Sequence, residues 1–410
     1  MRRSVTTDPT IHAALARVRI ALANADQARL WPNPVFNLAL RWPESGGSPT
    51  IEASLAQDLL TILQTKRRAN AADNRLRQAA ADAMAVALDV ASEVQERYAT
   101  AQAFDELIPA LETRRELLNR LIDLAHSRLN AGEGTRQDLT VLQAQRVELD
   151  VEIATTELER RDVRLRLARL IGEPSAAATW ELDHWVAPSY PNVPESVWVD
   201  LALQHRPEIQ SVIWQLAALG DDLALTRLLP IEGFSTGGNA EKNFDRSIGP
   251  EISTPLPLFD MGQARRARVT AEQIEARHEL TRTKRMVVED VRQAYETLER
   301  TSFNMQRVRS ELIPLQEQRM TDAEAMFRAE RDITGLILAE QDLRGAQARA
   351  IDLERQMTIA MIRLHRAVGG AGVAKTVAVK SVSIPIVAES ASHLNPAPLP
   401  TARDESKEMN

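Results

Sequence analysis

The sequence predicts a mainly helical chain with a small β part, built from two copies of one unit. Each unit is a β-hairpin followed by a long coiled-coil helical hairpin. Three observations support this fold class: an internal repeat, a short stretch of alternating apolar and polar residues in each half, and a much longer stretch with heptad spacing after it. Aromatic residues make up only 4% of the chain, and it has 16 glycines. This composition disfavours an enzyme with a thick aromatic core or a glycine-rich phosphate loop.

The repeat consists of short matching segments that occur in the same order in both halves. At a spacing of 198 residues the matches are Pro9 with Pro207, Arg67 with Arg265 and Gln143 with Gln341, and at 197 residues Leu167 matches Leu364. A Glu-Leu-Ile-Pro quartet ends at Pro109 and returns, 205 residues later, at Pro314. The extra seven residues are one heptad, which leaves a buried seam on the same side of a helix. We therefore favour a duplication over chance likeness of two low-complexity helices.

The repeat divides the chain into seven segments. We predict a first helix in 1–34, a β-hairpin in 35–60, a helical hairpin in 61–172, a linker and the second unit's first helix in 173–230, its β-hairpin in 231–260, its helical hairpin in 261–370, and a disordered tail in 371–410. The tail is rich in Pro, Ser, Ala and charge and has no stable period.

The strands are predicted from alternation with a period of two. Phe36, Leu38, Leu40 and Trp42 share one face of the first strand, and a Gly/Pro-rich turn separates it from a second alternating stretch at 51–56. In the second half the alternation is clear at 248–258. The strand before it is weaker, and we place it at 231–235, with a polar loop up to Arg246.

The helical hairpins are predicted to be long and thin. Each has two arms of about 60 residues, or roughly 90 Å, and turns near 130–134 or 331–335. The apolar stripe is narrow and contains many small residues, as at Leu343, Ala346, Ala350, Leu353, Met357, Ala360 and Leu364. Such helices suit a wall with water on both sides. Pro109 and Pro314 are interpreted as kinks, or as breaks where a collar packs.

Four strands per chain cannot close a barrel. If the apolar face meets a membrane, every strand edge must be paired, so several chains must pool their strands. Three chains would give 12 strands, an even number typical of such barrels, and 12 long helical arms.

Other function classes have little support. The net charge of -7 disfavours nucleic-acid binding. The chain contains no Cys, and its seven His lack ligand spacing, so we expect no metal site and no cofactor. We find no catalytic motif and predict that the protein is not an enzyme. No apolar run is long enough for a transmembrane helix, and the N-terminus does not read as a secretory leader, so we expect a truncated or late start.

Several motifs resemble one protein family. They are Pro32-Asn33-Pro34, Arg128 to Glu133, Arg206-Pro207-Glu208, Gly249 to Ser253, Pro255 to Gln263 and Leu364 to Gly370. Together they make the chain similar, from about Asp8 to Gly370, to the TolC-type outer-membrane efflux proteins. The most similar branch serves heavy-metal and multidrug pumps of the resistance-nodulation-division (RND) type.

The resemblance implies a homotrimer with a 12-stranded β-barrel in the outer membrane of a Gram-negative bacterium, continuing as a 12-helix α-barrel in the periplasm. It implies an exit duct for small molecules or metal ions. The implied partners are outer-membrane lipid, a periplasmic adaptor (membrane fusion) protein and an inner-membrane RND-type transporter. The alternatives from the residues alone are a soluble coiled-coil scaffold or adaptor, or a truncated, non-functional relative of the channel family.

The resemblance also nominates site residues. Acidic rings at the periplasmic aperture would come from Glu133, Asp138, Glu330 and Asp332, which are otherwise ordinary solvated helix ends. Adaptor docking would use Ala131, Gly132, Leu139 and Leu142, which otherwise form a plain helix turn. From the alternation, Arg41, Glu52 and Glu251 lie on the polar strand faces, where they line the barrel lumen or only satisfy one another.

Overall fold

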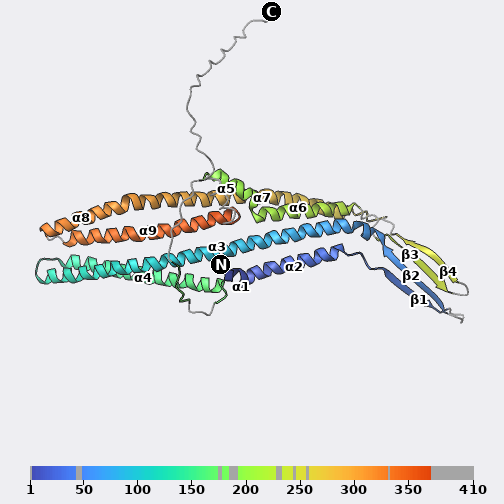
Figure 1. Cartoon of the computed structure of the whole chain (residues 1–410), viewed down its shortest axis with the longest axis horizontal. Coiled ribbons are helices and arrows are strands. Elements are labelled where there is room, and N and C mark those ends of the chain that lie inside the picture. Colours follow the sequence, from blue (N-terminus) through green and yellow to red (C-terminus); the bar gives the residue numbers. More distant parts are fainter. Residues whose placement is uncertain are drawn as a thin grey trace, which may run out of the picture.

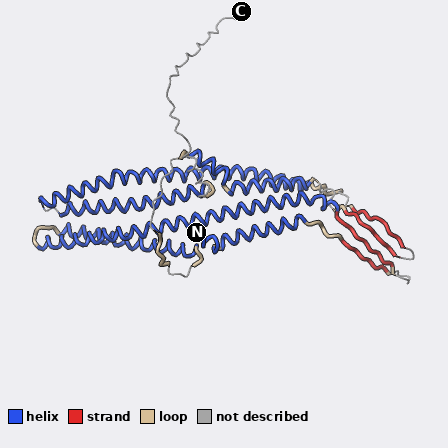
Figure 2. Tube along the Cα trace, in the orientation of Figure 1, coloured by secondary structure: helices blue, strands red, loops and turns tan. Residues whose placement is uncertain are grey.

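The computed structural model is a long, curved layer of helices with a small sheet at one end (Figure 1, Figure 2). It describes residues 2–42, 49–173, 178–183, 193–227, 233–242, 246–254, 258–330 and 333–370. The predicted tail 371–410 and the residues in the gaps lie outside this description. In the described part, no helix is long and apolar enough to cross a membrane.

The element order repeats, as the sequence predicts. The first unit contains α1 (Arg2–Thr7), α2 (Pro9–Arg29), β1 (Val35–Arg41), β2 (Thr50–Asp58), α3 (Leu59–Asn130) and α4 (Arg136–Leu170). The second contains α5 (Glu195–His205), α6 (Pro207–Thr226), β3 (Ser235–Lys242), β4 (Arg246–Ser253), α7 (Gln263–Arg307), a π-helical turn (Val308–Leu312), α8 (Ile313–Glu330) and α9 (Ile333–Ala367). Helices α4 and α9 both have 35 residues, which supports a duplication.

The two arms of each helical hairpin are unequal, so the expectation of two 60-residue arms is wrong. Helix α3 has 72 residues, roughly 110 Å at 1.5 Å per residue, whereas α4 has 35. A separate helix, α2, packs along the part of α3 that α4 does not reach (Figure 1). Helix α2 begins independently because Asp8 caps it, accepting hydrogen bonds from the backbone N–H groups of Thr10 and Ile11 at 2.8 and 3.3 Å.

The four strands form one antiparallel sheet in the order β1-β2-β3-β4. In its register Ala39 pairs with Glu52, and Glu52 pairs with Glu241. Side chains on one face are therefore mainly polar or small. The other face is mainly apolar and exposed, and it carries Phe36, Leu38, Leu40, Ile51, Leu55, Ile248 and Ile252.

The prediction for the third strand is wrong. It placed a strand at 231–235 and a loop up to Arg246, whereas β3 is Ser235–Lys242. This segment reads Ser-Thr-Gly-Gly-Asn-Ala-Glu-Lys, which has little intrinsic preference for a strand. It is a strand because β2 and β4 pair with it on both sides, so tertiary pairing overrides local preference.

The long helices lie side by side in one layer, and α5 packs against α7 and α6. Helices α2 and α4 lie along one edge and α7 and α8 along the other, with α3 next to the first edge and α6 and α9 next to the second (Figure 1). The heptad seam predicted on α9 is buried at Ala346, Ala350, Met357, Ala360 and Leu364. At mid-length it packs with α5, α6 and α7 around Trp198 and Leu298.

The two prolines have different effects on the backbone. Helix α3 continues without interruption through Pro109. In the second unit the α-helical pattern changes to the π-helical turn just before Pro314. A π-helical turn inserts an extra residue into the helix and re-aims the side chains beyond it. Only the second of the two predicted kinks therefore coincides with a change of helix type.

The tight approach of β2 to β3 yields a first prediction. A Cβ atom at Gly237 would lie 2.0 Å from the carbonyl oxygen of Leu55, whereas at Gly238 the nearest atom is 3.9 Å away. We expect Gly237→Ala to force the strands apart and destabilise the sheet by about 1–3 kcal/mol. Gly238→Ala is the matched control and should be tolerated. Thermal unfolding of the two purified variants measures the difference, and equal stability would contradict the register.

Candidate functional site

The turn between α3 and α4 forms one end of the molecule (Figure 1). Gly132 has a φ of 77°, in the left-handed region that favours glycine, and ends α3. The backbone N–H of Glu133 donates to the carbonyl of Arg128 at 2.9 Å. Thr135 and Asp138 form a capping box: the Thr135 hydroxyl accepts from the Asp138 N–H at 3.1 Å and donates to the Asp138 carboxylate at 2.7 Å. Thr135 is therefore the N-cap residue of α4, and the carboxylate of Asp138 completes the cap by accepting from the Thr135 backbone N–H at 3.3 Å.

A cavity of about 330 Å³ lies beside this turn. Three of the residues nominated from the sequence line it, namely Glu133, Asp138 and Leu142. Ile337 and Leu338 of α9 also line it, and no pattern in the sequence points to them. They belong to the other repeat, and only the side-by-side packing of the two hairpins brings them to the first turn.

The other nominated residues at this end are not gathered around the cavity. Ala131 and Gly132 are exposed and Leu139 is half-buried, and none of the three lines it. The side chain of Glu330 and all of Asp332 lie outside the described residues. Of the four acidic residues nominated for an aperture, the structure therefore describes the side chains of Glu133 and Asp138 alone.

The polar face of the sheet holds the three residues nominated for a lumen. Arg41 and Glu52 form an ion pair at 3.0 Å, and the amide of Asn239 donates to Glu52 at 3.3 Å. Glu251 lies on β4 opposite Gly237 on this same face, and its Oε2 atom is buried without a hydrogen-bond partner among the described residues. Glu241 joins this face opposite Glu52. Glu241 is not among the residues selected from the sequence, because its segment is predicted there to be a loop.

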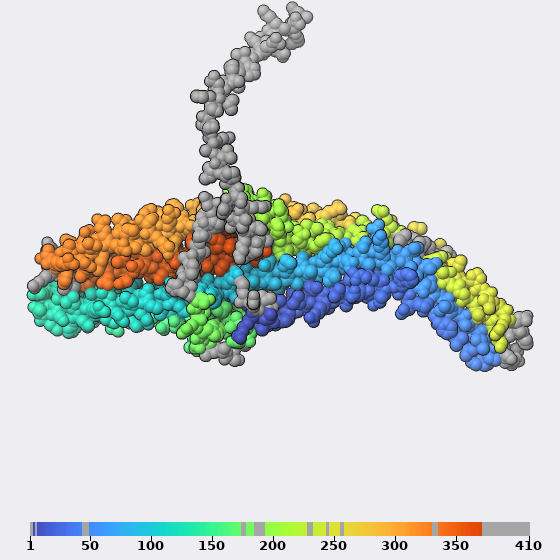
Figure 3. All heavy atoms as spheres, in the orientation of Figure 1, coloured from blue at the N-terminus to red at the C-terminus, as the bar shows by residue number. Residues whose placement is uncertain are grey.

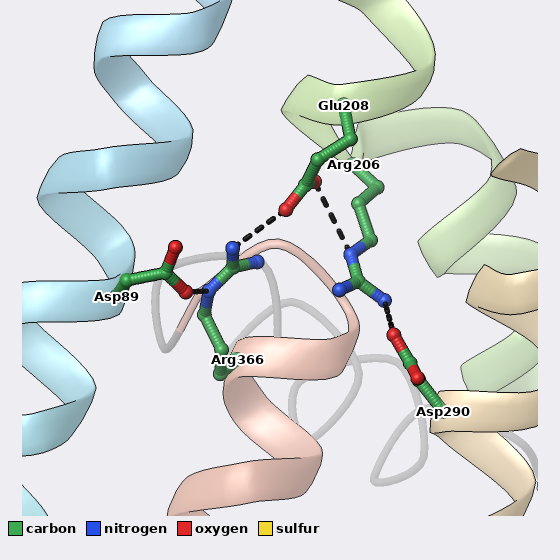
Figure 4. Close-up of polar contacts among 5 residues, drawn as sticks. All are labelled: Asp89, Arg206, Glu208, Asp290 and Arg366. Carbon is green, nitrogen blue, oxygen red and sulfur yellow. Dashed lines mark hydrogen bonds and ion pairs between the residues drawn. The ribbon is translucent and has the colours of Figure 1, made fainter.

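At mid-length, five charged side chains connect four helices (Figure 4). Arg366 of α9 donates to Asp89 of α3 and to Glu208 of α6, both at 2.6 Å. Arg206, which immediately precedes α6, donates to Glu208 at 3.2 Å and to Asp290 of α7 at 2.7 Å. Two motifs noted in the sequence, Arg206-Pro207-Glu208 and the end of α9, therefore meet in one network. Its position between helices of both repeats indicates a structural role.

Glu208 is the centre of this network because each of its carboxylate oxygens accepts from a different arginine. Burial by itself would raise the pKa of Glu208. The hydrogen bond from Arg366 and the charges of Arg366 and Arg206 outweigh that effect and lower the pKa below 4.5. The carboxylate is therefore ionised at neutral pH and binds both guanidinium groups. The side chain of Arg366 is only 12% exposed and that of Arg206 only 11%.

Comparisons with known proteins cover the first part of the chain by sequence and most of it by fold. Residues 3–173 match the family model described as "Outer membrane efflux protein". A search of curated proteins gives no significant match. Similar solved structures include the outer membrane protein VceC from Vibrio cholerae, with 16% identity, 90% of this chain and 95% of that chain covered, and a TM-score of 0.75.

Two further structures are similar over comparable lengths. The CmeC outer membrane channel of Campylobacter jejuni is 13% identical, with 94% of this chain and 89% of that chain covered and a TM-score of 0.74. The MtrE outer membrane channel of Neisseria gonorrhoeae is 15% identical, with 90% and 88% covered and a TM-score of 0.69. At these identities the likeness establishes the fold. The predicted resemblance is thus confirmed by the family match over residues 3–173 and by a TolC-like channel fold over nearly the whole chain.

The network at mid-length yields a second prediction. Glu208→Gln should lower the free energy of unfolding by about 1–3 kcal/mol at neutral pH, because both arginines lose a charged partner. Glu299→Gln, at an exposed position of α7, is the control and should have little effect. Urea unfolding followed by circular dichroism measures both.

The pH dependence of this effect has a definite sign. Because folding lowers the pKa of Glu208, its contribution is present above about pH 4.5 and is lost as the pH falls through the lowered value. The difference between the wild type and Glu208→Gln should therefore shrink on acidification. A difference that stays constant down to about pH 3 would show that the carboxylate charge is not what stabilises the network.

Proposed function

From the family match over residues 3–173 and the channel fold, we propose that this chain is one protomer of an outer-membrane exit duct in a tripartite efflux system. Three copies form the duct, which is a passive conduit for small molecules or metal ions and carries out no chemistry of its own. The energy comes from an inner-membrane RND-type transporter, and a periplasmic adaptor protein connects the two.

The single observation that carries this proposal is the open sheet. Within the described residues, strands β1 and β4 each pair on one side only, so two rows of backbone N–H and C=O groups face outward. One sheet face exposes large apolar side chains, with Phe36 65% and Ile248 84% exposed. A lipid environment would cover that face but would leave unpaired edges at a high energetic cost. Pairing β4 of one copy with β1 of the next removes every edge, and three copies close a 12-stranded barrel.

In the closed barrel, the apolar face meets outer-membrane lipid and the polar face lines the lumen. Arg41, Glu52 and Glu251 then lie inside the barrel, together with Glu241. The ion pair between Arg41 and Glu52 neutralises part of the charge. The two remaining glutamates in each copy give the lumen a net negative lining, which attracts cations.

The helical layer continues the barrel into the periplasm of a Gram-negative cell as a 12-helix tube. Its edges support this, because exposed apolar side chains occur on α4 at one edge and on α7 and α8 at the other. They are Val147, Val151, Leu158 and Leu165 on α4, and Ile274, Met286, Phe303, Leu315 and Met326 on α7 and α8. The edges of different copies would bury these side chains against each other.

The helix turns form the periplasmic end of the tube. Glu133 and Asp138, with Glu330 and Asp332 of the second turn, form the acidic aperture, since threefold symmetry repeats each residue three times. The adaptor docks at Ala131, Gly132, Leu139 and Leu142. The cavity lined by Leu142, Ile337 and Leu338 supports this location because it offers apolar surface beside the turn.

The experiment that tests the proposal uses the full chain, produced behind a cleavable secretory leader and extracted from the outer membrane in mild detergent. We expect a particle of three chains of 45.6 kDa each that forms conducting pores in a planar lipid bilayer. Recovery only as a soluble monomer or dimer would instead support a coiled-coil scaffold.

The aperture yields a third prediction. Glu133→Gln should lower the preference of the pore for cations over anions, because three charges leave a narrow entrance. Glu148→Gln is the control, because Glu148 is exposed on the same helical hairpin but lies outside the turn. The ratio of cation to anion permeability, from reversal potentials in a salt gradient, measures the effect. An unchanged permeability ratio in Glu133→Gln would show that Glu133 does not line the aperture.

A further inference from the structure

The outer edge of α4 carries an apolar stripe that no part of the described chain covers. Val147, Val151, Leu158 and Leu165 are spaced by four, seven and seven residues, so they follow one side of the helix. The buried residues of α4, such as Ile153 and Leu167, lie on the opposite side, against α3. Leu158 is the most exposed of the stripe, at 69%.

Beside the opposite edge of the layer, a hollow lies in the groove between the π-helical turn and α9. A cavity of about 440 Å³ is lined by Val308, Leu312 and Leu315 on the α7–α8 side and by Leu353 of α9, with Asn304, Arg307, Glu311 and Arg349 around them. Arg309 of the turn pairs with the buried Glu354 of α9, which holds the turn in place. At the matching place in the first unit α3 has no π-helical turn, because it is α-helical throughout.

The stripe and the hollow lie at the same height along the layer. Arg160 and Arg164 of α4 pair with Asp105 of α3 at 3.8 and 2.5 Å. The neighbouring Phe104 lies under Arg355 of α9, at 5.9 Å from guanidinium carbon to ring centre. The residue before Arg355 is Glu354, the partner of the π-helical turn. Leu158, two residues from Arg160, is therefore level with residues 308–312.

The charges around the two surfaces are complementary. Glu157 and Glu159 flank Leu158, are exposed, and form no ion pair within the described residues. Arg349 at the hollow is also exposed and has no ion-pair partner in the described part of the chain. Arg161, one turn from Leu158, adds one positive charge to the α4 side, so the immediate flanks of Leu158 remain acidic.

We propose that Leu158 of one copy inserts into the hollow at the π-helical turn of the next copy, with Glu157 or Glu159 meeting Arg349. The inference rests on the proposed trimeric duct and specifies its joint. The extra residue of the π-helical turn makes the two edges different in shape, so they fit each other and not themselves. Such a contact runs head to tail around a ring. It also sets the height of each copy relative to the next.

Cysteine cross-linking tests this joint directly, because the natural sequence contains no cysteine. The full chain carrying Leu158→Cys and Leu312→Cys is exported, oxidised mildly in the membrane, and separated without reductant. The two positions lie on opposite edges of one copy, with α3 and α9 between them, so a disulfide can form only between copies. We expect covalent trimers that revert to single chains on reduction.

The matched control pairs Leu158→Cys with Met326→Cys, which lies 14 residues nearer the helix turn on the same edge, or about 21 Å away. This pair should give no covalent trimer. A trimer by mass that fails to cross-link at Leu312, or that cross-links equally at Met326, overturns the inference but leaves the duct standing. If no trimer forms in the absence of oxidant, the proposed function itself fails.

A charge exchange provides an independent test if the cysteine variants fold poorly. Arg349→Glu should weaken the trimer, measured as a lower temperature for dissociation in detergent. Glu157→Arg and Glu159→Arg are then combined with Arg349→Glu one at a time, and one of the two should restore the temperature. Failure of both combinations, with the wild-type trimer intact, would show that Arg349 does not meet this edge of α4.

Discussion

The layered shape of the molecule follows from the small apolar area that each helix buries against its neighbours. The seams are lined by small side chains, and Ala101, Ala339 and Ala360 are almost fully buried where helices meet. Small residues let the helix backbones approach closely, but they bury little apolar area per turn. The long helices therefore form one layer, with two wet faces and two open edges. A single copy is consequently elongated, and exposed apolar side chains such as Val151 and Leu315 lie along its edges.

Because the apolar seam is thin, charged contacts carry much of the alignment between helices. The network around Glu208 connects α3, α6, α7 and α9 at one level, where the two repeats come together (Figure 4). Directional hydrogen bonds between charged groups set the position of one helix along another, whereas a uniform seam of alanines would allow the helices to shift. The network thus positions the sheet at one end relative to the helix turns at the other.

The duplication gives two similar units that are not equivalent. In the first unit α3 is a continuous α-helix. In the second unit the corresponding arm is interrupted by the π-helical turn at Val308–Leu312. Figure 3 shows the result as one bent body, with the first unit along one edge and the second along the other. A ring of identical chains joins one edge to a different edge, so a difference between the repeats is what such a joint requires.

The sequence by itself determined the repeat, the long narrow helices and three of the four strands, because heptad and two-residue periods are local properties that a linear chain displays. It also selected Glu52 and Glu251, which alternate clearly on their strands, and the turn residues Glu133 and Asp138. Only the tertiary structure decided that β3 is a strand, that α2 completes the line of α4, and that Ile337 approaches the first turn. Those features arise from pairing between segments far apart in the chain, where neighbouring backbones and side chains outweigh the weak preferences of the residues themselves.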